Sequence, residues 1–173
     1  MKTNSIHNIT LRRATLADVD KLYEWDKKPH VIASGADDDW VWEDAINNTA
    51  DWQEQLIAEL NGTPIGVIQI IDPEREETHY WGNIAPNLRA IDIWIGEETE
   101  LNKGYGTQMM QLAIERCFAP KEVTAIIIDP LAHNTDAIRF YQRLGFEFVE
   151  KRVFGDDECD VHQLSREKWL TLN

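Results

Sequence analysis

The stretch LNKGYGT (residues 101–107) most constrains the fold, because two glycines one residue apart stand directly before the helix-like run QMMQLAIERCF. Apolar residues recur in that run at helical spacing, from Met109 to Phe118. Glycine is a poor start for a helix unless the backbone itself has a task there. Before the loop, LRAIDIWIG (Leu88–Gly96) alternates as a strand does. This order indicates an α/β unit whose helix begins at a ligand.

The two glycines predict an anion site at the mouth of this helix. The first N–H groups of a helix lack internal acceptors, and the helix dipole adds partial positive charge. Without Cβ atoms, Gly104 and Gly106 would let a phosphate or pyrophosphate approach closely, with Thr107 adding a hydroxyl donor and Lys103 a positive charge. The loop is neither a Walker loop nor a dinucleotide-binding GxGxxG. An ordinary loop before a helix remains the alternative on the glycines alone.

Patterning along the chain predicts one domain over residues 1–173 with a mixed, mostly antiparallel α/β sheet flanked by helices. Strands are expected over Ile9–Ala14, Trp52–Leu60, Pro64–Ile71, Leu88–Gly96, Val123–Asp129, Phe146–Phe154 and Asp160–Ser165. Helices are expected over Leu16–Lys27, near Val41–Asn48, from Tyr105 onward and over Asn134–Leu144. Loops are expected over Pro29–Trp40 and Asp72–Asn87.

Local signals fix several boundaries. Thr15 and Asp18 have the spacing of a capping box, and Asn61-Gly62 is a strong hairpin turn signal. In the strand before the glycine loop, side chains alternate between the two faces of the sheet. One face is expected to carry Arg89, Ile91, Ile93 and Ile95, and the other Ala90, Asp92, Trp94 and Gly96.

The net charge of −14 limits the class of partner. Nucleic acid and anionic membranes would repel such a chain, whereas a cationic small molecule would be attracted; the alternative is that the charge only keeps the protein soluble. Cys117 and Cys159 make no disulfide framework, so a reducing cytoplasm fits, and Cys117 is expected in the core. The amino-terminal residues lack the apolar run of a signal peptide, and no apolar run is long enough for a membrane span, so neither is expected. The histidines show no metal-ligand spacing, so no metal site is expected.

The glycine loop, the helix, the buried strand and HNTDAIRFYQRLGF together resemble the GCN5-related N-acetyltransferase (GNAT) superfamily. In that superfamily a Q/R-x-x-G-x-G/A loop cradles the pyrophosphate of acetyl-CoA, and an N-x-x-A-I-x-x-Y-x-x-x-G-F segment lies on the other side of the cofactor. That segment corresponds here to Asn134, Ala137, Ile138, Tyr141, Gly145 and Phe146. One departure is Leu101, which replaces the usual Gln or Arg.

A closer similarity joins the chain to the aminoglycoside 6′-N-acetyltransferases and related siderophore-type acyltransferases. It rests on the blocks LYEWDKKPHVI, LNGTPIGVIQ, PNLRAIDIWIG, LNKGYGTQMM, EVTAIIIDP and NTDAIRFYQRLGF. The resemblance implies an acetyl-CoA-dependent transfer to a primary amine, most of all the 6′-amine of an aminoglycoside. It also implies a cofactor cradle made of Lys103, Gly104, Tyr105, Gly106, Thr107 and Asn134.

Two residues are candidates for the chemistry. Asp92 stands between Ile91 and Ile93, where an acidic group is unexpected without a purpose, and burial would raise its pKa and make it a better base. The resemblance assigns that position to acceptor binding and proton removal; pairing with Arg89 or exposure to solvent is the alternative. Tyr141 corresponds to the tyrosine that protonates the departing thiolate, or else is a half-buried helix aromatic.

The acceptor side is expected to be acidic and aromatic. Asp129 ends a strand, corresponds to an acceptor-pocket position, and would bind an ammonium unless it is only a turn residue before Pro130. The Asp37–Asp39 run, and Asp38 in particular, would attract a cation, whereas Glu74, Glu76 and Glu77 are expected to be solvated loop charges. The rings expected as flat walls for a sugar are Trp40, Trp42, Tyr80 and Trp81.

Three readings remain open. The first is transfer to an aminoglycoside, although Ala85 replaces the acidic residue that precedes the matching proline in the resistance enzymes. The second is acylation of another amine, such as a polyamine, a siderophore precursor or a protein amino terminus. The third is an acyl-CoA sensor without transfer activity. The sequence is compatible with a monomer or a homodimer.

Overall fold

The structure is a computed structural model, and it describes residues 8–35 and 41–173. Its seven strands form one sheet in the order β1-β2-β3-β4-β5-β7-β6. Every neighbouring pair is antiparallel except β4 and β5. The strands are β1 (Ile9–Arg13), β2 (Gln53–Leu60), β3 (Thr63–Ile71), β4 (Leu88–Ile95), β5 (Ala125–Ile128), β6 (Glu147–Phe154) and β7 (Asp157–Ser165). The predicted mixed, mostly antiparallel sheet is confirmed.

Six α-helices and two 3-10 turns are found in the described residues. The helices are α1 (Val19–Asp26), α2 (Pro29–Ala33), α3 (Trp42–Asn47), α4 (Tyr105–Phe118), α5 (Thr135–Arg143) and α6 (Arg166–Leu172), with 3-10 turns at η1 (Leu16–Asp18) and η2 (Glu98–Glu100). No helix in these residues is long and apolar enough to cross a membrane.

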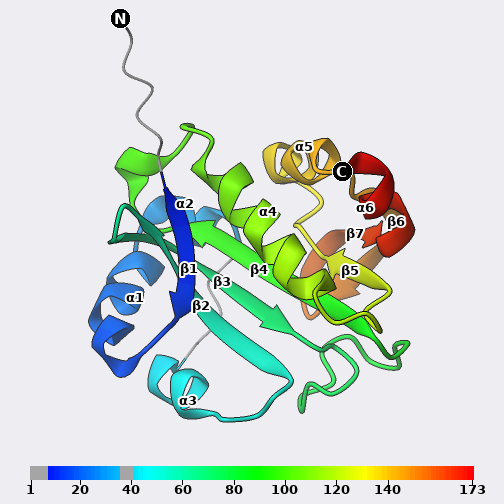
Figure 1. The fold of residues 1–173 in the computed structure, drawn as a ribbon, viewed down its shortest axis with the longest axis horizontal. Helices are drawn as coiled ribbons and strands as arrows, with labels where there is room; N and C mark the ends of the chain where they lie inside the picture. Colours follow the sequence, from blue (N-terminus) through cyan, green and yellow to red (C-terminus); the bar gives the residue numbers. More distant parts are fainter. Residues whose placement is uncertain (1–7, 36–40) are drawn as a thin grey trace, which may run out of the picture.

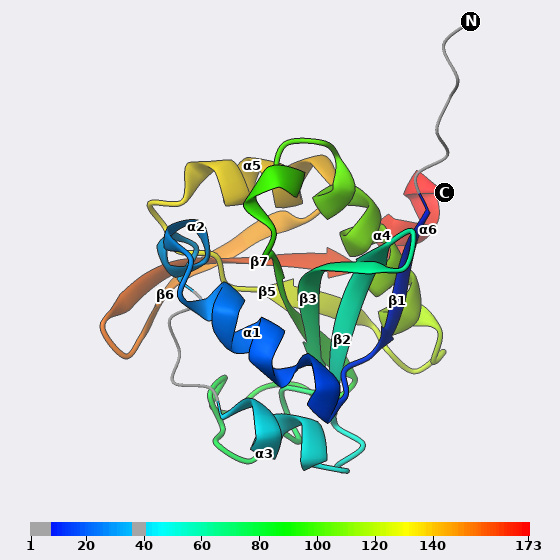
Figure 2. The ribbon, with the colours of Figure 1, turned by 90° about the vertical axis from the view of Figure 1, so that its left-hand side faces the viewer.

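Helices cover both faces of the sheet (Figures 1 and 2). On one face, α4 packs its apolar stripe on β4 through Met109, Met110 and Ile91. On the other face, α1 and α3 bury Trp25 and Trp42, in one cluster with Trp94 of β4. The alternation predicted for β4 is therefore confirmed, because its odd-numbered isoleucines face α4 and Trp94 faces α1 and α3.

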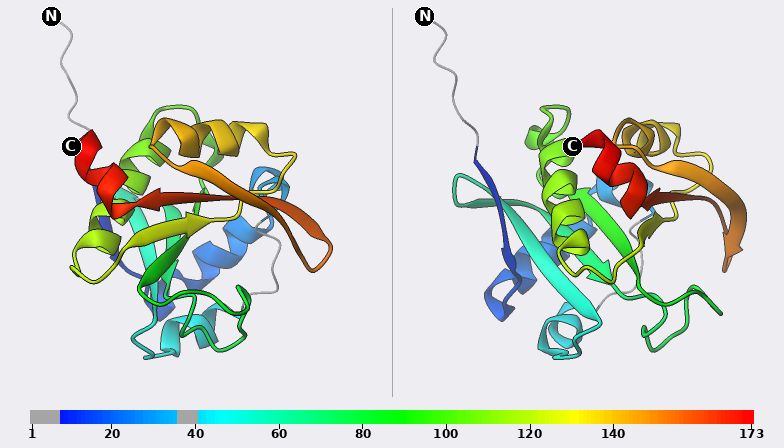
Figure 3. Two further views of the ribbon diagram at one scale, coloured as in Figure 1. Left: turned by 90° about the vertical axis from the view of Figure 1, so that its right-hand side faces the viewer. Right: turned by 45° about the vertical axis from the view of Figure 1, so that its right-hand side comes forward.

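The sheet opens in its middle. The pairing of β4 with β5 covers only Leu88–Ala90 against Ala125–Ile127, although β4 continues to Ile95. Beyond Ala90 the two strands diverge (Figure 3). The β6–β7 hairpin lies on the side of β5 away from β4 and extends past the end of β5. Backbone groups along the open edge of β4 are placed to pair with a bound ligand.

Several local predictions are confirmed. Asn61 and Gly62 both have positive φ, at 51° and 85°, as the hairpin turn between β2 and β3 requires. The Asp18 carboxylate accepts a hydrogen bond from the Thr15 backbone N–H at 2.8 Å, as a capping box does. Cys117 is 2 % exposed in the core, where burial raises the pKa of its thiol to about 12.

The secondary structure differs from the prediction in three places. Residues 29–33 form the short helix α2 and not a loop, because Pro29 occupies the first turn, where a proline needs no N–H acceptor. The chain also ends in a helix that was not predicted: the Ser165 hydroxyl accepts a hydrogen bond from the Lys168 backbone N–H at 3.1 Å and begins α6. In addition, β7 begins at Asp157, three residues before the predicted start.

Candidate active site

The glycine loop has the geometry of a helix mouth. Gly104 is the N-cap of α4 in the left-handed region, with φ 82°, and a Cβ there would meet nothing within 4 Å. The positive φ alone explains why residue 104 is a glycine.

Gly106 needs a different explanation. It lies in the first turn of α4, where an added Cβ would find only ordinary contacts of 3.8–3.9 Å, with Ile95 and Phe140. The packing of the protein therefore does not require glycine at this position. In a helix the Cα–Cβ bond tilts toward the amino terminus, so the missing methyl group leaves room where an anion would approach.

The other predicted cradle residues differ in what they can contribute. Tyr105 is 5 % exposed and its ring belongs to the core, while its backbone N–H lies in the first turn of α4. Lys103 is exposed and pairs with Glu100 at 3.2 Å, in reach of an incoming anion that would compete for it. Thr107 is partly buried in the first turn beside Gly106. These five residues remain the predicted pyrophosphate cradle.

A cavity of about 1100 Å³ lies over the opening of the sheet. It is lined by parts of α3, β2, β3 and the loop after β3, by β4 from Ala90 on, by the end of β5, by α5 and by the turn of the β6–β7 hairpin. Among the described residues that line it, no Lys, Arg or His is found, and seven are acidic: Asp44, Glu76, Glu77, Asp92, Asp129, Asp156 and Asp157. Such a wall favours a cationic ligand over an anionic one.

Asp92 lies in this cavity, and of the possibilities open from the sequence, exposure to solvent is the one found, so the burial that would have raised its pKa is absent. The residue is exposed, because its strand position faces the hollow side of the sheet and the opening of β4 from β5 leaves that side uncovered. The alternative pairing with Arg89 is also excluded, since Arg89 lies on the opposite face and pairs with Asp72 at 3.3 Å. The carboxylate of Asp92 is thus accessible to an acceptor.

Tyr141 reaches the same cavity from α5. It is 9 % exposed and packs edge-on against Phe146, with ring centroids 5.8 Å apart. Burial first, and then the charges of Asp92 and Asp129, raise the pKa of Tyr141 well above the ordinary tyrosine value. Its hydroxyl therefore stays protonated at neutral pH and can donate a proton or a hydrogen bond.

Asn134 begins the helix that carries Tyr141. Its side-chain oxygen accepts a hydrogen bond from the Ala137 backbone N–H at 3.2 Å, so the N-cap role is confirmed. Asn134 also lines the cavity, which keeps its predicted cofactor contact open.

Asp129 has a partner that the sequence did not indicate. The Tyr80 hydroxyl donates a 2.6 Å hydrogen bond to Asp129 Oδ2, although the two residues are 49 positions apart. Desolvation and the Asp129 charge raise the pKa of Tyr80 well above its usual value. Tyr80 in turn stacks on Phe154 with ring centroids 4.5 Å apart. The contact orients Asp129 at the cavity wall.

The predicted aromatic walls are only partly present. Trp42 is fully buried and its Nε1 donates to Asp26 at 2.6 Å, so its prediction as a wall was wrong. Trp81 lines the cavity but is 3 % exposed, because Phe154 and Arg152 cover its ring. Tyr80, 47 % exposed, presents the open ring.

Predictions on the loops divide in a similar way. Glu76 is 8 % exposed and not solvated: its carboxylate accepts hydrogen bonds from the backbone N–H groups of Thr78 and Tyr80, at 2.7 and 3.1 Å, and so folds the loop that carries Tyr80. Glu74 and Glu77 are exposed, as predicted. Asp38, with the rest of Asp37–Asp39 and Trp40, lies outside the described residues.

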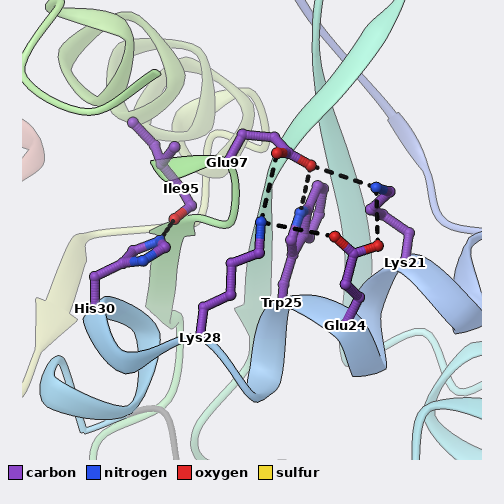
Figure 4. Close-up of polar contacts among 7 residues, drawn as sticks. All are labelled: Lys21, Glu24, Trp25, Lys28, His30, Ile95 and Glu97. Carbon is purple, nitrogen blue, oxygen red and sulfur yellow. Dashed lines mark hydrogen bonds and ion pairs between the residues drawn. The ribbon is translucent and has the colours of Figure 1, made fainter. Parts of the chain in front are cut away.

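A polar cluster ties the amino-terminal helices to the end of β4 (Figure 4). The Glu97 carboxylate accepts a 2.9 Å hydrogen bond from Trp25 Nε1, and two lysine ammonium groups lie 3.4 and 3.5 Å from it. His30 Nε2 lies 2.9 Å from the carbonyl oxygen of Ile95. A Cβ on Gly96 would lie 2.0 Å from the Trp25 ring, so this position must be glycine. The cluster holds the strand end from which the glycine loop leaves.

Comparison with known proteins identifies the family. The profile of the acetyltransferase (GNAT) domain matches residues 14–154. The chain belongs to the GNAT acetyltransferases. It is accordingly an N-acetyltransferase, and the acetyl donor of this family is acetyl-CoA.

Individual relatives of this GNAT protein are known in sequence and in structure. The aminoglycoside N(6′)-acetyltransferase type 1 of Klebsiella pneumoniae is 35 % identical over 159 residues, covering 84 % of this chain and 77 % of the relative. The lysine N-acyltransferase MbtK of Mycobacterium tuberculosis is 24 % identical, covering 80 % and 69 %. The solved aminoglycoside acetyltransferase AAC(6′)-Ib in complex with coenzyme A and kanamycin superposes with a TM-score of 0.83 at 28 % identity, over 95 % of this chain and 98 % of that one.

Proposed function

We propose that this protein transfers the acetyl group of acetyl-CoA to the 6′-amine of an aminoglycoside, and so confers resistance to it. The observation that carries the acceptor class is the cavity wall, which holds seven acidic side chains and, among its described residues, no basic one. A polycationic amino sugar gains from such a wall both in encounter rate and in binding. The relatives named above that act on aminoglycosides support the same acceptor.

The chain supplies a place for each partner of the reaction. The pyrophosphate of acetyl-CoA would lie at Gly104 and Gly106, and its pantetheine arm along the open edge of β4, beyond Ala90. The thioester then reaches the cavity between Asp92 and Tyr141. Asp129, oriented by Tyr80, would hold a second ammonium of the acceptor.

The chemical step is a direct displacement. The ammonium of the acceptor loses a proton to Asp92, directly or through one water. The amine nitrogen attacks the thioester carbonyl carbon, the N–C bond forms, and the C–S bond breaks. The departing thiolate takes a proton from Tyr141, whose raised pKa keeps that proton available at neutral pH. A cytoplasmic location fits this reaction, since both cysteines are free and buried.

The experiment that tests the proposal measures thiol release from acetyl-CoA with kanamycin, tobramycin, spermidine, lysine and a short peptide. We expect turnover with the two aminoglycosides and little with the others. Asp92→Asn should lower kcat/KM for kanamycin about 100-fold or more, in the range of general base catalysis. The matched control is Asp20→Asn, which removes an exposed carboxylate of α1 outside the cavity and should change nothing.

The alternatives give distinct results. Turnover with spermidine or the peptide alone would replace the aminoglycoside by that acceptor while keeping the acetyltransferase. Binding of acetyl-CoA without turnover on any amine would indicate a sensor. Unchanged kinetics in Asp92→Asn would remove Asp92 from the mechanism.

A further inference from the structure

The last residue of β4, Ile95, directs its backbone toward the opening of the sheet. The next residue, Gly96, donates its N–H to the carbonyl oxygen of Ile65 at 2.9 Å. In an antiparallel pair, residues that bond across to the partner alternate with residues whose N–H and C=O face the other side. Ile95, which is opposite Gly66 of β3, therefore faces the other side, where β5 has already diverged. In the described part of the chain no strand pairs with β4 there.

His30 of α2 takes the place of the missing strand. Its Nε2 lies 2.9 Å from the Ile95 carbonyl oxygen (Figure 4). Because a carbonyl oxygen only accepts, Nε2 must carry the hydrogen and donate it. The other ring nitrogen, Nδ1, is enclosed and has no hydrogen-bond partner within residues 8–35 and 41–173. The polar contact that orients this ring is thus the bond to Ile95.

Two contacts bound the open stretch of β4. The strand β5 pairs with it as far as Ala90, and His30 closes it at Ile95. Between them Ile93 has the same direction as Ile95, so its N–H and C=O both face the opening. With the Ile95 carbonyl occupied by His30, the groups left for a ligand are the C=O of Ile93 and the N–H groups of both isoleucines.

This stretch leads from the glycine loop to the reacting groups. A Cβ on Gly106 would lie 3.8 Å from the Ile95 side chain, so the pyrophosphate site adjoins the end of β4. Asp92 lies earlier in the same strand and lines the cavity together with Ile93. The arm of acetyl-CoA carries amide groups, and an amide-bearing chain can pair with the free edge of a strand as a further strand would.

We propose that His30 is a positioning residue for the arm of acetyl-CoA. Its bond to the Ile95 carbonyl holds the end of β4 extended and removes that carbonyl as an acceptor. An amide N–H of the arm then has the Ile93 carbonyl as its acceptor on this edge, which sets the register of the arm and the place of the thioester beside Asp92. The inference rests on the part of the proposed function that places the arm along β4.

Loss of the His30 donor has two consequences for the arm. The Ile95 carbonyl becomes a second acceptor one strand repeat away, so the arm can bind in a shifted register. The end of β4 also loses its only tie to α2 at this carbonyl. Acetyl-CoA should then bind more weakly, whereas its nucleotide part, held at the glycine loop, should bind as before.

Two substitutions of similar length separate the hydrogen bond from the shape of the side chain. His30→Gln places an amide nitrogen as many bonds from Cα as Nε2, and His30→Met has no donor. Isothermal titration measures Kd for acetyl-CoA and for adenosine 3′-phosphate 5′-diphosphate, which is its nucleotide part without the arm. We expect His30→Met to raise the acetyl-CoA Kd about 5- to 10-fold, as for one lost hydrogen bond, and to leave the nucleotide Kd within about twofold. His30→Gln should leave both within about twofold.

A second variant covers the case in which His30→Met does not fold. His30→Asn keeps an amide that is one bond too short to reach Ile95, and it should weaken acetyl-CoA as His30→Met does. Thermal melts of each free protein show which variants are folded, and the titrations need no acceptor.

Several results would overturn the inference. One is an unchanged acetyl-CoA Kd in a folded His30→Met or His30→Asn protein, which would leave His30 a purely structural role. Another is equal weakening of both ligands, which would place the effect at the glycine loop. A His30→Gln protein that binds acetyl-CoA as weakly as His30→Met would exclude the hydrogen bond as the cause. The expected titrations without turnover on any aminoglycoside would overturn the proposed acceptor and support the role of His30.

Discussion

Gly106 offers a prediction in which stability and function should move in opposite directions. Replacing glycine by alanine inside a helix stabilises a protein by about 0.5–1 kcal/mol when the methyl group fits. It fits here, because its nearest neighbours would be Ile95 and Phe140 at 3.8 Å. For a chain of this size, about 1 kcal/mol corresponds to roughly 2–4 °C in the melting temperature. Gly106→Ala should therefore melt about 1–4 °C higher without ligand.

The same methyl group should weaken acetyl-CoA binding. It points toward the helix amino terminus, where a phosphate oxygen must come within about 2.9 Å of a backbone nitrogen. Losing one charge-assisted hydrogen bond of about 1.5–3 kcal/mol corresponds to roughly a 10- to 150-fold rise in Kd. Isothermal titration with acetyl-CoA, beside thermal melts of the free protein, measures both effects.

The matched control is Gly62→Ala in the β2–β3 turn. It places a methyl group at φ 85°, with nothing within 4 Å, far from the glycine loop. It should lower stability by about 1 kcal/mol and leave the acetyl-CoA Kd unchanged. A Gly106→Ala protein that binds acetyl-CoA as tightly as the original would refute the assignment of α4 as the pyrophosphate site, and a less stable one would show that Gly106 serves packing.

Three further predictions follow from single contacts. Tyr141→Phe should lower kcat about 100-fold with a modest change in stability. Because burial raises the pKa of Tyr141, the kcat of the unmodified enzyme should not fall through this group between pH 7 and 10. A fall in kcat with an apparent pKa near 10, present in the unmodified enzyme and absent from Tyr141→Phe, would contradict the protonated role of Tyr141. Gly96→Ala should destabilise the protein by about 3 kcal/mol or more in urea unfolding, because the new Cβ meets the Trp25 ring, and a wild-type midpoint would show that this contact relaxes freely. Asp18→Asn should be less stable at pH 7, because the Arg12 hydrogen bond holds the pKa of Asp18 below its usual value. That stability is present above the unfolded pKa and lost as pH falls through the folded one, so a difference between the two proteins that does not shrink as denaturation curves are taken to lower pH would contradict this origin.

The sequence predicted most of the fold because its signals are local. The Asn61-Gly62 turn, the Thr15–Asp18 capping box and the stripe of α4 each depend on a few neighbouring residues. The errors arose where one local signal has two readings. Pro29 both ends one helix and begins the next, and Ser165 both closes β7 and caps α6.

The site was less accessible to sequence reasoning, because it depends on pairs that only the folded sheet brings together. Asp92 is exposed because β4 separates from β5, and no sequence signal near Asp92 predicts that separation. The Tyr80–Asp129 bond and the His30–Ile95 bond likewise join segments that are far apart in the sequence.

The most direct test of the central claim is the identity of the product formed from kanamycin and acetyl-CoA, determined by mass spectrometry and by NMR assignment of the acetylated nitrogen. The account predicts a single acetyl group on the 6′-nitrogen, formed together with one equivalent of free CoA thiol. Acetylation at another nitrogen or at a hydroxyl, or no acetylated kanamycin while acetyl-CoA remains bound, would contradict it.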